Sequence, residues 1–262
     1  MNNLRRKLKA GEVVYSCYGM LAEPVWVDLV GAAGFDMMVL DCEEVAGDNY
    51  GAAIENMVRA ADAAQMSSCI RVVENIPGAI NRALNTGTEG IFIPHVRSAD
   101  EARAAVAAAR YAPVGCRGAA PVVRGAGYGV RKWDEYYAAA EEALVFIMVE
   151  DKEGVSNIEE IVKVPGIDGI MVGTWDLAVE LGRAQIGPTH PEVTAHVDHV
   201  IDVTVGAGLV MAAQAWSPEA TAKYAARGCQ LLFVSLDSLF LIDGITKVRN
   251  IANELESAEA DA

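Results

Sequence analysis

Polar side chains that can do acid–base or metal chemistry stand at the ends of several short apolar segments. They are Asp41, Glu43, Glu44, Arg71, His95, Glu150, Asp151, Asp176 and Asp237. Carboxylates gathered at one place repel one another unless a cation compensates their charge. One arginine supplies part of that charge. A hard divalent metal would supply the rest, and an oxygen-rich ligand set favours Mg²⁺ or Mn²⁺ over zinc.

For these side chains to meet, the apolar segments must be strands whose carboxyl ends share one edge. Eight short, β-branched and nearly continuously apolar runs are typical of strands covered on both faces. They span residues 13–20, 37–43, 67–73, 90–96, 143–150, 169–173, 209–216 and 231–237. Helical patterns alternate with them, such as 49–65 and 98–112, where Ser98 ahead of Glu101 is a candidate N-cap.

This strict alternation predicts a (β/α)8 TIM barrel, in which active sites lie at the C-terminal ends of the strands. An open doubly wound sheet is the alternative, but the first strand is followed by GMLAEPVW, with no glycine-rich phosphate loop. We expect one barrel domain over residues 1–262. Two features fall outside the repeat, namely a long loop at 115–135 and an extra C-terminal helix near 239–257 with a polar tail that we expect to fray.

Composition excludes several classes of function. The net charge of −15 and pI of about 4.7 argue against nucleic acid as a partner. No apolar run is long enough to span a membrane, and the first residues lack the apolar core of a secretory signal. The five cysteines have no CxxC spacing, so we expect buried, reduced thiols in a cytoplasmic protein.

Together, several stretches carry a resemblance to a known family. They are GFDMMVLDCEE, IRVVE, GIFIPHVRSADEARAAVAAARYAPVGCRG, VEDKEGVSNIEEI, PGIDGIMVGTWDLAVELG and HPEV. The chain resembles the HpcH/HpaI aldolase family of metal-dependent pyruvate aldolases, which includes 2-dehydro-3-deoxyglucarate aldolase. The similarity extends over residues 4–250, nearly the whole chain.

The resemblance implies a metal site and its ligands. Glu150 and Asp176 would bind the metal directly, and Asp41 and Glu43 would hold water molecules bound to it. The metal would be Mg²⁺ or Mn²⁺, with Co²⁺ and Zn²⁺ left open. The resemblance also suggests a homohexamer, with the C-terminal helix packed on a neighbouring subunit.

The resemblance assigns the substrate contacts as well. Arg71 would contact the 2-oxo oxygen and stabilise the enolate, and the backbone N–H groups of Trp175 and Asp176 would bind the pyruvate carboxylate. Pyruvate would chelate the metal, which would act as a Lewis acid. The partners are then a small 2-oxo acid and a carbonyl compound.

The sequence departs from the family pattern at the general base. The family has D-x-E-H after the second strand, whereas here Glu44 stands where the histidine is expected. The aspartate that orients this histidine corresponds to Asn85, and the tryptophan expected in the first strand is Tyr18. The usual His–Asp dyad is therefore replaced by Glu44 and Asn85, which would hydrogen-bond each other.

Two residues remain candidates for the base. Glu44 occupies the family position, and His95 stands at a strand end, where a packed rim histidine is the other interpretation.

The basic residues of the 115–135 loop suggest a lid over an anionic second substrate, with Arg124 on its distal carboxylate. A solvated loop, or one packed on a neighbouring subunit, is the alternative.

The predicted function is that of a divalent-metal-dependent carbon–carbon lyase, a class II aldolase that acts on a pyruvate-type enolate and an aldehyde or other carbonyl acceptor. Loss of the dyad keeps a citrate-synthase-like condensing enzyme of the same family open. A non-catalytic homologue that only binds 2-oxo acids is the third possibility, and enolisation of pyruvate would separate it from the other two.

Overall fold

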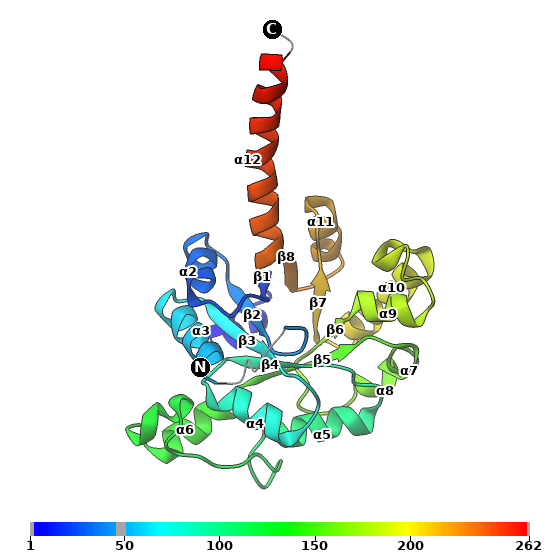
Figure 1. Cartoon of the computed structure of the whole chain (residues 1–262). Coiled ribbons are helices and arrows are strands. Elements are labelled where there is room, and N and C mark those ends of the chain that lie inside the picture. The colour runs from blue at the N-terminus through cyan, green and yellow to red at the C-terminus, as the bar shows by residue number, and fades with distance from the viewer. Residues whose placement is uncertain (1–2, 46–50, 261–262) are drawn as a thin grey trace.

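Eight parallel strands form a closed barrel in the computed structural model, which describes residues 3–45 and 51–260 (Figure 1). The strands are β1 Val14–Gly19, β2 Met37–Asp41, β3 Ser67–Arg71, β4 Gly90–Ile93, β5 Leu144–Val149, β6 Gly169–Val172, β7 Val210–Gln214 and β8 Leu231–Leu236. Each strand pairs with the next, and β1 closes the ring with β8. The predicted (β/α)8 fold is confirmed, and every predicted apolar run contains one strand.

Helices follow the strands around the outside of the barrel, and one helix lies before the first strand and one after the last (Figure 1). They are α1 Asn3–Lys9, α2 Pro24–Ala32, α3 Ala52–Ala63, α4 Pro77–Asn85, α5 Ala99–Ala109, α6 Trp133–Ala140, α7 Lys152–Ser156, α8 Ile158–Ile161, α9 Thr174–Glu180, α10 Pro191–Gly206, α11 Pro218–Ala226 and α12 Asp237–Ala260, with 3₁₀ turns η1 Arg124–Gly129 and η2 Gly187–Thr189. Ser98 caps α5 by accepting from the Glu101 N–H, as predicted. The helix predicted at 49–65 begins at Ala52, and residues 49–50 lie outside the described part of the chain.

The side chains inside the barrel form a stack that leads up to the strand ends. Phe92 stacks on Phe146 with ring centroids 4.6 Å apart, and Phe92 meets Phe233 edge to face. Phe233 in turn stacks on Tyr18 at 4.7 Å. The barrel is therefore a packed core rather than a pore, and its uppermost ring, Tyr18, forms the floor of the region above it.

The N-terminal end of the barrel is closed by the short helix α1. Leu4 and Leu8 are buried in the barrel core. The Leu4 N–H donates to Glu89, and Arg5 forms an ion pair with Asp168 at 2.6 Å. These contacts seal the end of the barrel opposite to the carboxyl ends of the strands.

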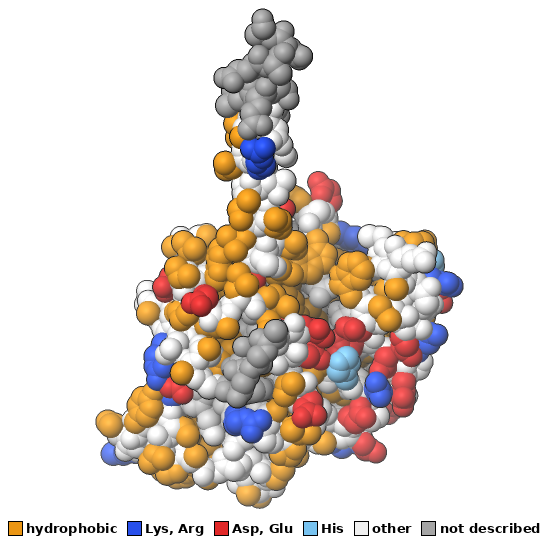
Figure 2. Space-filling view, viewed as in Figure 1, with side chains coloured by type: hydrophobic (Ala, Val, Ile, Leu, Met, Phe, Trp, Pro, Cys, Tyr) orange, Lys and Arg blue, Asp and Glu red, His pale blue; other side chains and the backbone are white. Residues whose placement is uncertain are grey.

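The last helix, α12, extends away from the barrel instead of folding back on it (Figure 1). It begins at Asp237, directly after β8 ends at Leu236, and it runs to Ala260, so it continues through most of the tail that was expected to fray. Figure 2 shows hydrophobic side chains along the helix and over the adjoining part of the barrel. Among them, Ile242, Ile245 and Val248 are each more than half exposed.

The structure bears on the expected burial of the cysteines and on the search for membrane-spanning helices. Cys17, Cys42, Cys69 and Cys229 are free and buried, but Cys116 is exposed, so the prediction of buried thiols is wrong for that residue. Cys116 lies in the loop after α5, where no sheet or helix covers it. Within the described residues, no helix is long and apolar enough to cross a bilayer.

Candidate active site

The centre of the site is a buried ion pair between neighbouring strands. The β2–β3 register sets Asp41 directly opposite Arg71 at the ends of the two strands. The Arg71 Nε and Nη2 atoms donate to the two oxygens of Asp41 at 2.8 and 2.6 Å, and Nη1 lies 2.8 Å from Glu43. Arg71 also lies over the Tyr18 ring, 5.5 Å from its centroid. The structure thus brings together Asp41, Glu43 and Arg71, three of the strand-end residues that were expected to meet.

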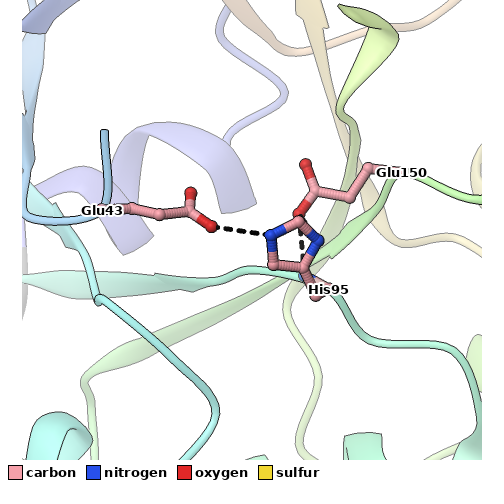
Figure 3. A group of neighbouring side chains, drawn as sticks. All are labelled: Glu43, His95 and Glu150. Atoms are coloured by element: carbon pink, nitrogen blue, oxygen red, sulfur yellow. Dashed lines mark hydrogen bonds and ion pairs between the residues drawn. The ribbon is translucent and has the colours of Figure 1, made fainter. Parts of the chain in front are cut away.

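A second group joins the ends of β2, β4 and β5. Figure 3 shows the His95 ring between Glu43 and Glu150. The His95 Nε2 lies 3.0 Å from Glu43 Oε1, and Nδ1 lies 3.3 Å from Glu150 Oε1. The His95 backbone N–H also donates to Glu150 Oε1 at 2.7 Å. This histidine is therefore part of a group with two carboxylates.

Gly173, between β6 and α9, lets Glu150 approach the next strand. A Cβ at Gly173 would lie 2.5 Å from the Glu150 Cβ and would overlap the Glu150 carboxylate. The backbone φ of Gly173 is −77°, so close approach and not conformational freedom requires glycine here. The sequence analysis did not single out this residue, although its place between an apolar strand and Thr174 at the start of α9 could have indicated it.

A cavity of about 320 Å³ opens at this end of the barrel. Its lining includes Tyr18, Met20, Glu44, Arg71, Met148, Glu150, Gly173, Thr174, Trp175, Asp176, Gln214, Trp216 and Leu236. Most of the predicted site residues thus face one space. The sequence analysis missed Gln214 and Trp216 at the end of β7, and Gln214 is held by a 2.6 Å hydrogen bond from the Thr174 hydroxyl.

Burial shapes the electrostatics of the carboxylates. Desolvation raises the pKa of Glu43 to about 7, against the opposing charge of Arg71. Burial also raises the pKa of Glu150, although the His95 N–H and ring oppose that shift and the nearby charge of Asp176 adds to it. For Arg71, burial alone would lower the pKa, but the hydrogen bonds and charge of Asp41 outweigh it and raise the pKa. The site therefore holds more buried negative charge than Arg71 offsets.

That surplus fits a divalent cation. One ligand atom from each of Glu43, His95 and Glu150 can be chosen so that all lie within 4.8 Å of one another. Two carboxylates with raised pKa values and an imidazole are a donor set that such ions bind. The structure therefore contains a candidate metal site. Asp176, the other predicted ligand, lines the same cavity and is exposed.

Two of the predicted rim carboxylates have structural roles instead. Asp151 caps α7 by accepting from the Gly154 N–H at 2.7 Å, and it pairs with Arg97. Asp237 is fully buried and accepts from the backbone N–H groups of Leu21 and Ser238. Both carboxylates therefore cap a helix or a loop through these hydrogen bonds.

The expected pairing of Asn85 with Glu44 is wrong within one chain. Asn85 ends α4, which carries the chain from the C-terminal end of the barrel back to the start of β4. It accepts a hydrogen bond from Arg117 at 3.3 Å, and it is absent from the lining of the cavity described above. Glu44 is exposed and lines that cavity at the other end of the barrel.

The lid prediction fails for the same reason. The 115–135 loop follows α5 and leads through α6 to the start of β5, so it also lies at the N-terminal end of the barrel. Arg124 pairs there with Asp62 and donates to the Thr86 carbonyl. Within its own chain it cannot clamp a substrate in the cavity, because the barrel lies between them.

Comparison with known proteins agrees with this geometry. The sequence profile of the HpcH/HpaI aldolase/citrate lyase family matches residues 15–242. The chain belongs to this family. Both reactions in the family description cleave carbon–carbon bonds, and curated relatives are named as aldolases, so the predicted enzyme class, a carbon–carbon lyase, is confirmed.

Similar proteins include aldolases and a citrate synthase. The chain is 34% identical to a hydroxypyruvate/pyruvate aldolase of Chromohalobacter salexigens, with 87% of this chain and 88% of that protein covered. It is 33% identical to a 5-keto-4-deoxy-D-glucarate aldolase of Klebsiella pneumoniae, with 76% of each covered. It also resembles the crystal structure of the citrate synthase SbnG, with a TM-score of 0.88 at 28% identity over 98% of this chain and 100% of that one.

Replacing Gly173 by alanine tests whether close packing positions Glu150. The added methyl group would displace the Glu150 carboxylate, so we expect the affinity for Mg²⁺ or Mn²⁺ to decrease at least about tenfold, as for loss of a residue that orients a ligand. Calorimetric titration measures this. Gly206→Ala is the matched control, because nothing lies within 4 Å of its Cβ, and it should leave the affinity unchanged. Unchanged affinity in Gly173→Ala would show that Glu150 does not need this space.

Proposed function

We propose that this chain is a divalent-metal-dependent class II aldolase that acts on pyruvate or a close 2-oxo acid analogue and on an aldehyde or other carbonyl acceptor. The observation that carries the proposal is the cavity of about 320 Å³ bounded by Arg71, Glu150 and Asp176. This volume is at the small end of ligand sites, as suits a short 2-oxo acid with a small acceptor.

Arg71 is suited to hold the oxygen that becomes negative in the reaction. Asp41 and Glu43 engage one N–H on each of its three nitrogens, which leaves one N–H on each terminal nitrogen for the 2-oxo oxygen. Because Asp41 holds the Nε and Nη2 edge of the guanidinium and Glu43 holds Nη1, the arginine needs no reorganisation when charge develops. Tyr18 supports it from below.

The remaining roles follow from the residues around the cavity. Glu150 and Asp176 would hold the metal, with Glu43 and Asp41 on its water molecules, and the backbone N–H groups of Trp175 and Asp176 would receive the substrate carboxylate. When bound, the cation supplies Lewis-acid polarisation of the 2-oxo group. In aldol cleavage, a base takes the proton of the acceptor-side hydroxyl, the carbon–carbon bond breaks, and the electron pair passes to the 2-oxo oxygen opposite Arg71.

Glu44 is our proposed base or the residue that holds the water through which the proton moves. It lines the mouth of the cavity, one residue after Glu43. A carboxylate in that position can accept a proton from the acceptor hydroxyl without contacting Arg71. Asn85 would take part only if another copy of the chain brought it to this cavity.

A condensing enzyme of the citrate synthase type is the second candidate. Two observations favour it, namely the similarity to the SbnG structure and the carboxylate of Glu44 in place of the family's histidine. An oxaloacetate-type acceptor would then replace the aldehyde. Because both candidates need the same enolate, a screen of aldehydes and 2-oxo acids with several divalent metals distinguishes them.

Enolisation tests the shared chemistry. With Mg²⁺ or Mn²⁺, we expect the enzyme to exchange deuterium from the solvent into the pyruvate methyl group, followed by NMR. Glu150→Gln and Asp176→Asn should each lower the exchange rate at least about 100-fold and weaken metal binding, because each removes an anionic ligand worth several kcal/mol. The exposed Glu159→Gln is the control and should behave as wild type. Full metal affinity in both ligand variants would contradict the assignment, and absence of exchange in the wild type would favour a binding protein.

The role of Glu44 has its own test. Glu44→Gln should lower turnover in the proton-transfer step by roughly 10²–10⁴-fold, the usual effect of losing a general base. Metal affinity, measured by calorimetry, should change little because Glu44 is not in the candidate ligand group. Wild-type turnover in Glu44→Gln would leave this residue without a catalytic role.

We further propose that the chain forms a homo-oligomer in which α12 packs on a second copy. With no residue between β8 and α12, the chain lacks the loop that it would need to fold the helix back on its own barrel. The barrel correspondingly leaves a hollow of about 470 Å³ beside α11, lined in part by Tyr15, Trp216 and Val234. Tyr15 and Trp216 are both more than 40% exposed. A helix from a second copy would cover this apolar surface, and a hexamer is the assembly that we expect.

Light scattering tests the assembly. The wild type should be larger than a monomer at micromolar concentration, and the double substitution Ile242→Asp with Ile245→Asp should shift it towards the monomer. Burying each isoleucine is worth about 1.5–3 kcal/mol, and a buried unpaired charge is costly. Lys247→Gln on the same helix serves as control and should keep the wild-type size. A monomeric wild type would contradict the proposal.

A further inference from the structure

His95 holds an unusual position beside the candidate metal site. It stands two residues beyond the end of β4 with φ at +55°, in the left-handed region that few residues other than glycine adopt. A hydrogen bond from its backbone N–H to Glu150 holds this conformation. As a result, the ring extends over the ends of β2 and β5, and each ring nitrogen faces a carboxylate (Figure 3).

We infer that His95 is a metal ligand in this chain, which supplies a nitrogen donor beside Glu150, and that Glu43 binds the ion directly instead of through the water molecule proposed above. The inference rests on the proposed metal-dependent function and adds a ligand to it. Two ligand atoms of one ion are at most about 4.2 Å apart, because each bond is about 2.1 Å long and the atoms are farthest apart on opposite sides of the ion. The selected atoms of His95, Glu43 and Glu150 lie within 4.8 Å of one another, so only small movements bring all three onto one ion.

The position of the ring argues against proton transfer between His95 and the substrate. Glu43 and Glu150 occupy both ring nitrogens, and His95 is not among the described residues that line the substrate cavity. The side chain is 51% exposed, so it is held by these two carboxylates rather than by packing. A cation would replace the proton on one ring nitrogen and would bind that nitrogen beside the carboxylate oxygen that it now faces.

A nitrogen donor changes which ions the site prefers. Carboxylate and water ligands suit Mg²⁺ and Mn²⁺, whereas imidazole strengthens binding of Co²⁺ and Zn²⁺ much more than that of Mg²⁺. A neutral ligand also leaves more of the positive charge of the ion uncompensated than a third carboxylate would. We therefore expect this site to bind Co²⁺ and Zn²⁺ considerably more tightly than Mg²⁺.

Removing the imidazole tests the inference without adding backbone strain. His95→Gly suits the left-handed conformation, and His95→Asn tolerates it while it offers only an amide. By calorimetry, both variants should lose about 100-fold or more in Zn²⁺ affinity, beyond the 10–100-fold cost of losing a residue that only orients a ligand. Their Mg²⁺ affinity should stay within about threefold of wild type, since Mg²⁺ depends on the oxygen ligands. His199→Gly, at an exposed position on α10, is the control for general effects of histidine loss.

Pulsed EPR of the Mn²⁺-loaded protein gives a second readout that does not depend on activity. The wild type should show coupling to a directly bound ¹⁴N nucleus, and His95→Gly should lose it. If the wild type shows no nitrogen coupling, or if both His95 variants bind Zn²⁺ as tightly as wild type, then His95 only neutralises the carboxylates and the inference is wrong. Failure of Glu150→Gln to weaken Mg²⁺ binding would instead contradict the proposed metal site itself.

Discussion

The site depends on the buried ion pair between Arg71 and Asp41. The register of two neighbouring strands sets these residues side by side, and the bidentate contact fixes the guanidinium plane. Removing one partner from such a pair commonly costs about 3–5 kcal/mol, because the other charge is left buried and uncompensated. Tyr18 lies between this pair and the aromatic stack inside the barrel, so the packed core also supports the arginine. Every role that we propose for Glu43, Glu150 and His95 assumes that Arg71 stays in this place.

The two ends of the barrel serve different purposes. At the carboxyl ends of the strands, Glu43 and Glu150 are buried near one another with too little positive charge, a state that favours cation binding. At the opposite end, ion pairs join neighbouring elements, as in the pairs of Arg5 with Asp168 and of Arg124 with Asp62. The carboxylates with raised pKa values that surround the cavity thus lie at the end where chemistry is expected, and these ion pairs stabilise the closure of the other end.

The C-terminal helix connects the fold of one chain to the assembly. In a (β/α)8 barrel, each helix usually returns along the outside and covers its own strands. Here the helix continues from β8 without a turn, so the strand ends near Tyr15 and Trp216 lack cover from their own chain. One missing loop thus accounts both for the exposed apolar face of α12 and for the uncovered hollow beside α11.

The sequence by itself determined the barrel, the strands and most of the site. Strand identity depends on local apolar runs, and parallel strands in a closed ring bring their carboxyl ends together whatever the details. The presence of Arg71, Glu150 and Asp176 around one cavity followed from that rule. The family pattern likewise located the departure at Glu44.

Only the tertiary structure decided which of the polar residues are used, and how. Asp237 accepts a hydrogen bond from the backbone of Leu21, and the His95 ring is directed at two carboxylates by an unusual backbone dihedral angle. Both features depend on contacts between segments that are distant in the sequence. Asn85 and Arg124 were assigned to the wrong end. Asn85 ends α4 and Arg124 follows α5, and in a (β/α)8 barrel such helices carry the chain back to the N-terminal ends of the strands, so the position of both residues in the repeat could have indicated the other end of the barrel.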